Sequence, residues 1–340
     1  MVSGRKGSVL ARPYLTHQTE RKPLNTYAAS RSITLLAKPR PQDTLPPSPA
    51  KEEERMTKVL YERDGRIARI TLNRPEVMNA IDDELPHLLA AAVARADADP
   101  AVHVMVLSGN GPAFCAGYDL TYYAEGNGNG QATQDMPWDP IQDYAFMWKN
   151  TQAFMSLFRA LKPVICKVHG FAVAGGSDIA LCCDLVFMED TAQIGYMPAR
   201  VWGCPTTAMW VYRLGPEKAK RMLFTGDKIT GAEAEQMGLI LKSTPADQLD
   251  KAVEDMAHRM ASVPVNQLAM QKLVINQAIE QTGLMNTQRL ATIFDGITRH
   301  SPEGLNFKTR AEAVGWKQAV HERDSGTYDW TLDRPINPRG

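Results

Sequence analysis

The segment that decides the fold is residues 163–188, which read PVICKVHGFAVAGGSDIALCCDLVFM. It begins with a short apolar run (163–168) typical of a buried strand, passes through a glycine-containing turn (169–178) and continues as a helical stretch to residue 183. A second apolar run follows at 184–188. This strand–turn–helix–strand order favours parallel strands joined by crossover helices, so it predicts an α/β fold.

The alternation of strands and helices extends to both sides of this segment. Asp64 and Gly65 separate two alternating runs within residues 59–72, which predicts a hairpin. Other expected elements are a helix over 82–98 capped by Asp82, a strand over 102–107 and a helix over roughly 143–161. After about residue 227 the pattern becomes nearly all helical, with helices expected near 230, from Pro245 and over 264–282.

Composition excludes several classes of function. The formal net charge is zero, which gives no general attraction to nucleic acid or acidic membranes. No run of about 20 apolar residues predicts a membrane span. The five cysteines have no Cys-x-x-Cys pair and no zinc-type spacing, so we expect a reducing compartment and no metal site.

The first part of the chain differs from the rest. Residues 1–51 hold nine Lys and Arg against two acidic residues, with many Pro, Ser and Thr. Such a composition is typical of a mitochondrial transit peptide, but a disordered leader, or a true start at Met56, fits equally well. The location is the mitochondrial matrix if 1–55 are a transit peptide, and otherwise the cytoplasm. We expect a leader (1–55), a core (56–262) and a C-terminal helical region (263–340).

Two glycine-rich turns carry the chemistry. The first occupies residues 109–120 and the second residues 169–178, and each follows a predicted strand and precedes a predicted helix. A helix N-terminus leaves N–H groups without partners, and glycine lets a ligand approach the backbone closely. One N–H from each turn, aimed at one point, would form an oxyanion hole that stabilises a thioester enolate. A single turn of this kind is better explained as a tight strand-to-helix turn that needs glycine for packing, and the pair of turns carries the prediction.

Four segments make the sequence resemble the enoyl-CoA hydratase/isomerase (crotonase) family over nearly all of residues 57–335. They are Ile70-Thr71-Leu72-Asn73-Arg74-Pro75 with Asn79-Ala80, the turn 114–120, the turn and helix 170–184, and Ala192-Gln193-Ile194-Gly195 with Pro198 and Gly203. The resemblance implies a crotonase-type spiral of ββα units and trimerisation through the C-terminal region, often with pairing into hexamers. It also implies acyl-CoA substrates, so that coenzyme A is part of the substrate, and no metal or other cofactor.

The resemblance also assigns site residues. The backbone N–H groups of Tyr118 and Gly175 are the expected oxyanion donors, and Asp178 handles the proton. Coenzyme A is expected along Glu76, Val77, Met78, Ala116, Gly117, Asp119 and Leu120. Tyr196 could hold a water or donate a proton, and Lys272 stands where many members place a phosphate-binding lysine; an ordinary solvated lysine is the alternative.

Hydratases of the family that this sequence resembles use two catalytic glutamates, and neither is present here. Asp178 stands at the first position and Ala199 at the second, with no Asp or Glu between Gly195 and Trp202. Hydration needs a base for water and an acid for the α-carbon, whereas isomerisation needs one group that takes and returns a proton. Asp178 could also be only a helix cap.

Three functions therefore stay open from the sequence. The first is an acyl-CoA hydratase or isomerase that uses Asp178. The second is a related enzyme of other chemistry, C–C cleavage or substitution on an aromatic acyl-CoA, for which a tyrosine-rich loop leaves room. The third is a non-catalytic acyl-CoA binder, supported only by Ala199.

Overall fold

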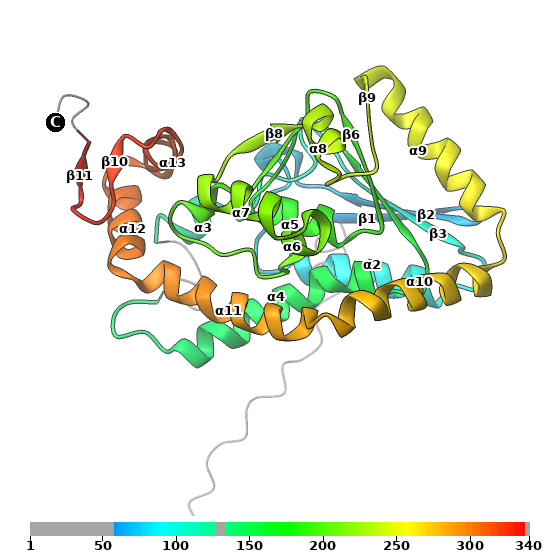
Figure 1. Cartoon of the computed structure of the whole chain (residues 1–340), viewed down its shortest axis with the longest axis horizontal. Helices are drawn as coiled ribbons and strands as arrows, with labels where there is room; N and C mark the ends of the chain where they lie inside the picture. Colours follow the sequence, from blue (N-terminus) through cyan, green and yellow to red (C-terminus); the bar gives the residue numbers. More distant parts are fainter. Residues whose placement is uncertain (1–57, 127–133, 337–340) are drawn as a thin grey trace, which may run out of the picture. The chain divides into compact units, whose positions relative to one another are not determined.

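The computed structural model describes residues 58–126 and 134–336, and within them a six-stranded sheet forms the centre of the fold (Figure 1). Its strands, in spatial order, are β1 (Val59–Asp64), β2 (Ile67–Leu72), β3 (Val104–Gly109), β4 (Val164–Val168), β6 (Leu185–Glu189) and β9 (Lys242–Thr244). β1 and β2 form the predicted antiparallel hairpin, and every other neighbouring pair is parallel.

A second, smaller sheet positions the second glycine turn. It consists of β5 (Phe171–Val173), β7 (Gln193–Gly195) and β8 (Lys228–Thr230), with β7 in the middle. β5 is parallel to β7, and β7 is antiparallel to β8. An isolated parallel bridge between Cys115 and Ala172 joins the first glycine turn to the edge of this sheet.

Helices surround both sheets. They are η1 (Pro75–Val77), α2 (Leu85–Ala98), α3 (Leu120–Tyr123), α4 (Pro140–Arg159), α5 (Gly175–Cys182), η2 (Met197–Ala199), α6 (Met209–Leu214), α7 (Pro216–Thr225), α8 (Gly231–Met237), α9 (Ala246–Ala261), α10 (Val265–Gln281), α11 (Leu284–His300), α12 (Pro302–Val314) and α13 (Trp316–Ser325). A two-stranded hairpin follows, β10 (Tyr328–Asp329) with β11 (Arg334–Pro335). α11 packs against α4, and α10 and α11 are consecutive in gold and orange in Figure 1.

Both faces of the large sheet are buried, as parallel strands with continuous apolar runs require. In β3, Met105 and Leu107 join the core cluster that includes α2, α4 and α5. Their neighbours Val104 and Val106 join a second cluster on the opposite face, covered by α9. Successive side chains of β3 point to opposite faces of the sheet, so its single apolar run contributes to two separate cores.

The predicted α/β fold, with its helical C-terminal region, is confirmed. The helix predicted over 82–98 begins at Leu85, and its N-cap is Glu84 and not the predicted Asp82. Asp82 accepts the N–H groups of Glu84 and Leu85 at 3.1 and 2.9 Å. The alternative interpretation of Asp178 as a helix cap is wrong, because α5 begins three residues earlier and Asp178 lies inside its first turn.

Two expectations remain untested by the fold. The leader expected over residues 1–55 lies outside the described residues, and the division at 262–263 stays a prediction. Within 58–126 and 134–336, no helix has both the length and the apolar character that crossing a membrane requires.

Candidate active site

A cavity of about 640 Å³ lies where the two glycine turns meet α11 and α13. Its volume is typical of a small-molecule site, and most of its surface is apolar. Of the residues predicted to bind substrate, those that line it are Glu76, Val77, Met78, Ala116, Tyr118, Asp119, Leu120, Gly175, Asp178 and Tyr196. Gly117 does not line the cavity but shapes the turn behind it.

The two glycine turns pack directly on each other. The N–H of Cys115 donates to the carbonyl of Phe171 at 2.9 Å, and the N–H of Val173 donates to the carbonyl of Cys115 at 3.1 Å. A Cβ added to Gly176 would lie 2.2 Å from the Cys115 carbonyl oxygen. Gly117 has φ +90°, and a Cβ there would lie 2.8 Å from Cβ of Ala174. Glycine at 117 and 176 is therefore what allows the turns to touch.

Each turn presents one backbone N–H without a partner among the residues that the structure describes. Gly175 is the first residue of α5, where the helix supplies no acceptor. At the other turn, the N–H of Ile81 donates to Gly117 and the N–H of Asp119 donates to Ile81, at 2.8 and 3.0 Å. Ile81 and Tyr118 form an isolated parallel bridge, in which the N–H of Tyr118 points away from Ile81. Tyr118 and Gly175 both line the cavity.

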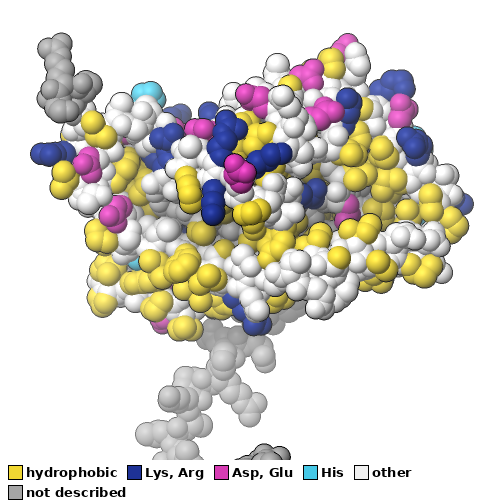
Figure 2. Space-filling model, in the orientation of Figure 1, with side chains coloured by type: hydrophobic (Ala, Val, Ile, Leu, Met, Phe, Trp, Pro, Cys, Tyr) yellow, Lys and Arg dark blue, Asp and Glu magenta, His cyan; other side chains and the backbone are white. Residues whose placement is uncertain are grey.

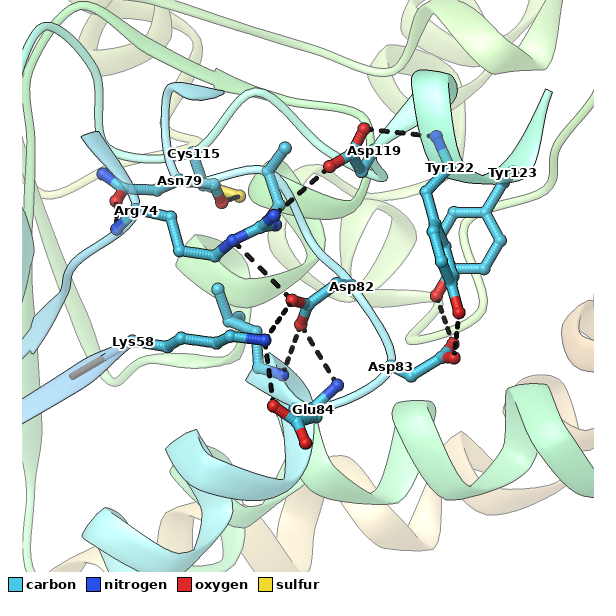
Figure 3. Close-up of polar contacts among 12 residues, drawn as sticks. Lys58, Arg74, Asn79, Asp82, Asp83, Glu84, Cys115, Asp119, Tyr122 and Tyr123 are labelled. Carbon is cyan, nitrogen blue, oxygen red and sulfur yellow. Dashed lines mark hydrogen bonds and ion pairs between the residues drawn. The ribbon is translucent and has the colours of Figure 1, made fainter. Parts of the chain in front are cut away.

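A polar network holds the first turn in place (Figure 3). The Arg74 guanidinium donates to the carbonyl of Ala80 and pairs with Asp119 at 3.3 Å. The Asp119 carboxylate in turn accepts the N–H of Tyr122 and caps α3. Asn79, at φ 56°, donates from Nδ2 to the carbonyl of Ala113 at 2.9 Å. These bonds fix the backbone on both sides of Tyr118.

The tyrosine-rich segment after this turn is only partly a pocket wall. Tyr123 lines the cavity, whereas Tyr122 and Trp138 do not. The hydroxyl groups of Tyr122 and Tyr123 both donate to the carboxylate of Asp83, at 2.9 and 2.6 Å (Figure 3). This shared acceptor ties α3 to the loop before α2.

Asp178 is a buried carboxyl group on α5 with one face on the cavity. Its Oδ1 accepts a short hydrogen bond from the hydroxyl of Thr207. Burial raises the pKa of Asp178 to about 8, more than the bond from Thr207 lowers it, and the charge of Asp295 raises it further. Asp178 therefore carries a proton at neutral pH, as a proton donor to a substrate requires.

Sequence reasoning missed the contribution of the C-terminal helices. Asp295 and Arg299 on α11 and Trp316 and Lys317 on α13 line the cavity, together with Arg323. Asp295 and Arg299 form an i,i+4 ion pair, a spacing that the sequence shows but that is common on solvated helices.

Among the residues described, no group of three or more His, Cys, Asp or Glu side chains could hold a metal ion.

The predicted phosphate-binding role of Lys272 is wrong. The lysine is buried away from the cavity, and its ammonium group donates to the carbonyls of Leu157 and Lys162 at 2.9 and 3.1 Å. It also pairs with Asp184 at 2.8 Å. All three protons are used inside the fold, so none is left for a ligand.

We expect Lys272→Met to act on stability and not on substrate binding. Removing one partner of a buried ion pair leaves the other charge unpaired and costs about 3–5 kcal/mol. Thermal unfolding should therefore shift downward by many degrees, while KM for an acyl-CoA stays within about twofold at a temperature where the variant is folded. A raised KM with unchanged unfolding would restore the phosphate-binding role.

Three comparisons place the chain among known proteins. The Enoyl-CoA hydratase/isomerase family profile matches residues 62–314. A putative enoyl-CoA hydratase of Mycobacterium tuberculosis is 31% identical over 290 residues, 81% of this chain and 88% of the relative. The crystal structure of an enoyl-CoA hydratase from Mycobacterium smegmatis aligns with a TM-score of 0.75 and 46% identity, covering 79% of this chain and 94% of that one. The chain therefore belongs to the enoyl-CoA hydratase/isomerase family and is an acyl-CoA enzyme of that type.

Proposed function

We propose that this enzyme binds an acyl-CoA with the thioester oxygen on the N–H groups of Tyr118 and Gly175 and stabilises the enolate formed there. The observation that carries the proposal is the pair of unpartnered N–H groups, on two turns in contact, in the cavity that Asp178 also lines. Donors fixed before the reaction stabilise developing charge without reorganisation.

Asp178 is the proposed proton carrier. In an enoyl thioester, its proton would go to the α-carbon as the enolate collapses; in a 3-enoyl thioester, its carboxylate form would take an α-proton and return it at the γ-carbon. Both steps use only groups of the chain and the substrate, so we propose no cofactor beyond the coenzyme A that the substrate carries.

Coenzyme A would lie along the mouth of the cavity. Residues 76–78, Ala116 and residues 118–120 line the cavity and would supply backbone and apolar contacts to it. Lys228 and Lys317 line the same cavity and replace Lys272 as the candidate partners for its phosphates.

The test is turnover of crotonyl-CoA and of a 3-enoyl-CoA, followed by product analysis. We expect at least one to react, and we expect Asp247→Asn, at an exposed carboxylate on α9, to match the wild type. Tight binding of acyl-CoA with no turnover of any thioester would favour a non-catalytic binder instead.

A second candidate substrate class is an aromatic acyl-CoA. Tyr118, Tyr123, Trp202, Trp316 and Phe171 all contribute to the cavity wall, and aromatic rings pack favourably against one another. An aromatic acyl-CoA that reacts by C–C cleavage or substitution, with crotonyl-CoA inert, would assign the enzyme to this second class.

We also propose that copies of this chain associate through α11. Leu290, Ile293, Phe294 and Ile297 recur at helical spacing and are 43–51% exposed. Figure 2 shows hydrophobic side chains gathered over this helix. An apolar stripe of this kind on a surface helix marks an interface, and the family resemblance favours trimers, often paired into hexamers.

We expect Ile293→Glu to release monomers because it places a charge in that stripe. Light scattering coupled to size exclusion should give a trimer or hexamer for the wild type and a monomer for the variant. Phe224→Glu, on α7 and 80% exposed, is the matched control and should keep the wild-type mass. A monomeric wild type would rule out the interface.

The cellular location is a further proposal. A relative from Dictyostelium discoideum, 28% identical over 75% of this chain and 89% of its own, is described as a probable mitochondrial enoyl-CoA hydratase. That description and the basic composition of residues 1–51 support a transit peptide. Import into isolated mitochondria with removal of the leader would test it.

A further inference from the structure

A second carboxylate reaches the cavity from an unexpected element. The residue at position 199, on η2, is alanine, so no carboxylate comes from that helix. Asp295, on α11, lines the same cavity as Asp178 although 117 residues separate them in sequence. Its side chain is 5% exposed, and no sequence motif surrounds it.

The carboxylate of Asp295 is held at both oxygens. Oδ1 accepts the backbone N–H of Cys204 at 2.9 Å, and Oδ2 pairs with the guanidinium of Arg299 one helical turn later. Each carboxylate oxygen can accept two hydrogen bonds, so each has capacity left for a water or substrate in the cavity. These two contacts set the orientation of the Asp295 carboxylate in the absence of a ligand.

Arg299 is shared with a third carboxylate, Asp143 on α4. Gly296 makes this possible, because a Cβ at that position would lie 2.0 Å from Oδ2 of Asp143. Burial raises the pKa of Asp143 to about 6. Asp143 does not line the cavity, which distinguishes it from Asp295.

The other acidic residues of the cavity belong to the first turn, to α13 or to the proposed coenzyme A end. Asp119 pairs with Arg74, and Asp324 pairs with Arg323. Glu76 belongs to η1, in the segment assigned to coenzyme A. Burial raises the pKa of Asp178 and of two cavity tyrosines, Tyr118 and Tyr196, and the charge of Asp295 raises each further.

Asp178 and Asp295 thus differ in their surroundings. Asp178 has a hydroxyl partner and keeps its proton, whereas Asp295 forms an ion pair with Arg299. Acid–base catalysis uses pairs of titratable groups that lie in one cavity in different surroundings.

We propose that Asp295 is the second catalytic carboxylate of this cavity, the base that activates water for addition to an enoyl-CoA while Asp178 acts as the acid. The proposal rests on the proposed function above and names the reaction as hydration. The fixed position of the Asp295 carboxylate on the cavity wall carries it.

Water gives one proton to the Asp295 carboxylate, and its oxygen forms a bond to the β-carbon. The electron pair of the C=C bond moves into the thioester enolate, held by the N–H groups of Tyr118 and Gly175. The enolate then takes the proton of Asp178 at the α-carbon. Transfer of a proton from Asp295 to Asp178 through cavity water restores both groups, so one water has been added.

Two reactions separate the roles of the carboxylates. Hydration of crotonyl-CoA needs both, whereas exchange of the α-protons of butyryl-CoA in D₂O needs only Asp178. We expect Asp295→Asn to lose hydration by about 10²–10⁴ and to keep exchange within about tenfold, and Asp178→Asn to lose both. Asp143→Asn removes a carboxylate from the same ion cluster outside the cavity, and should reduce hydration by less than about tenfold.

Other results would contradict either the role of Asp295 or the proposed function itself. Wild-type exchange without hydration, or hydration by Asp295→Asn within about threefold of wild type, overturns the role of Asp295 alone. Equal loss of both reactions in Asp295→Asn, with lowered thermal stability, assigns Asp295 a structural role. Failure of the wild type to exchange or to turn over any acyl-CoA overturns the proposed function itself.

Discussion

Asp178→Asn is expected to lower the turnover of the reactive acyl-CoA by about 10²–10⁴, the range that a positioned acid or base contributes. Asparagine keeps the size of the side chain and can still accept the Thr207 hydroxyl, so the cavity should keep its shape. KM should change little, because the role proposed for Asp178 is proton transfer and not substrate binding. Steady-state kinetics on purified, folded variant measure both quantities.

The pH dependence gives an independent check on the same residue. The protonated acid is required, so the rate of hydration should fall as pH rises through about 8, the pKa of Asp178. A rate independent of pH between 6 and 9, with Asp178→Asn fully active, would remove Asp178 from the mechanism.

The contribution of Asp178 to the stability of the folded chain should fall as pH rises. The pKa of Asp178 rises from an ordinary value of 3.8 to about 8 on folding, so between these values the folded chain binds the extra proton. Stability contributed by this group is therefore lost as pH rises from about 4 to about 8. Asp178→Asn removes the penalty, so its Tm advantage over wild type should grow across that window. An advantage that does not grow would show that burial does not control this carboxyl group.

Gly176→Ala is the second variant with a large expected effect. Its Cβ would lie 2.2 Å from the carbonyl oxygen of Cys115, which is backbone and has no flexible end to move aside. The two turns must separate, and the N–H groups of Tyr118 and Gly175 then no longer meet at one oxygen. Loss of one oxyanion donor costs about 10²–10³ in rate, and overpacking costs about 1–3 kcal/mol of stability. Kinetics and thermal unfolding of the purified variant should show both losses.

Gly238→Ala provides the matched control. Gly238 has φ +80° at the C-cap of α8, with no atom within 4 Å of an added Cβ. Its replacement costs about 1 kcal/mol through backbone strain alone and leaves the turns untouched. Normal kcat in this variant, with reduced kcat in Gly176→Ala at equal residual stability, would attribute the loss to the oxyanion hole. Equal kcat in both would contradict it.

The sequence predicts the parts of the site that depend on local pattern. An apolar run followed by Gly-Gly is enough to predict a strand, a turn and a helix here, although α5 begins at Gly175, three residues before the predicted start at Asp178. The Asp64–Gly65 turn likewise predicts the β1–β2 hairpin. In each case the glycine and the periodicity lie within a few residues of the feature they determine, so no long-range contact is needed to infer it.

The missed and mistaken residues depend on contacts far apart in sequence. Lys272 pairs with Asp184, 88 residues away, and its position on a helix does not show that its side chain turns inward. Asp295 reaches the cavity only because α11 packs against α4, where Gly296 accommodates Asp143. Both outcomes follow from helix packing, which the periodicity of a single helix does not determine.

The most direct test of the central claim is proton exchange at the α-carbon of butyryl-CoA in D₂O, followed by NMR at a pH above about 8, where Asp178 is a carboxylate and can take the α-proton. A thioester held by two N–H groups beside Asp178 should exchange its α-protons with wild-type enzyme, and exchange should fall by at least about 10² in Asp178→Asn. Absence of exchange with wild-type enzyme at saturating thioester, or equal exchange in both proteins, would contradict the account.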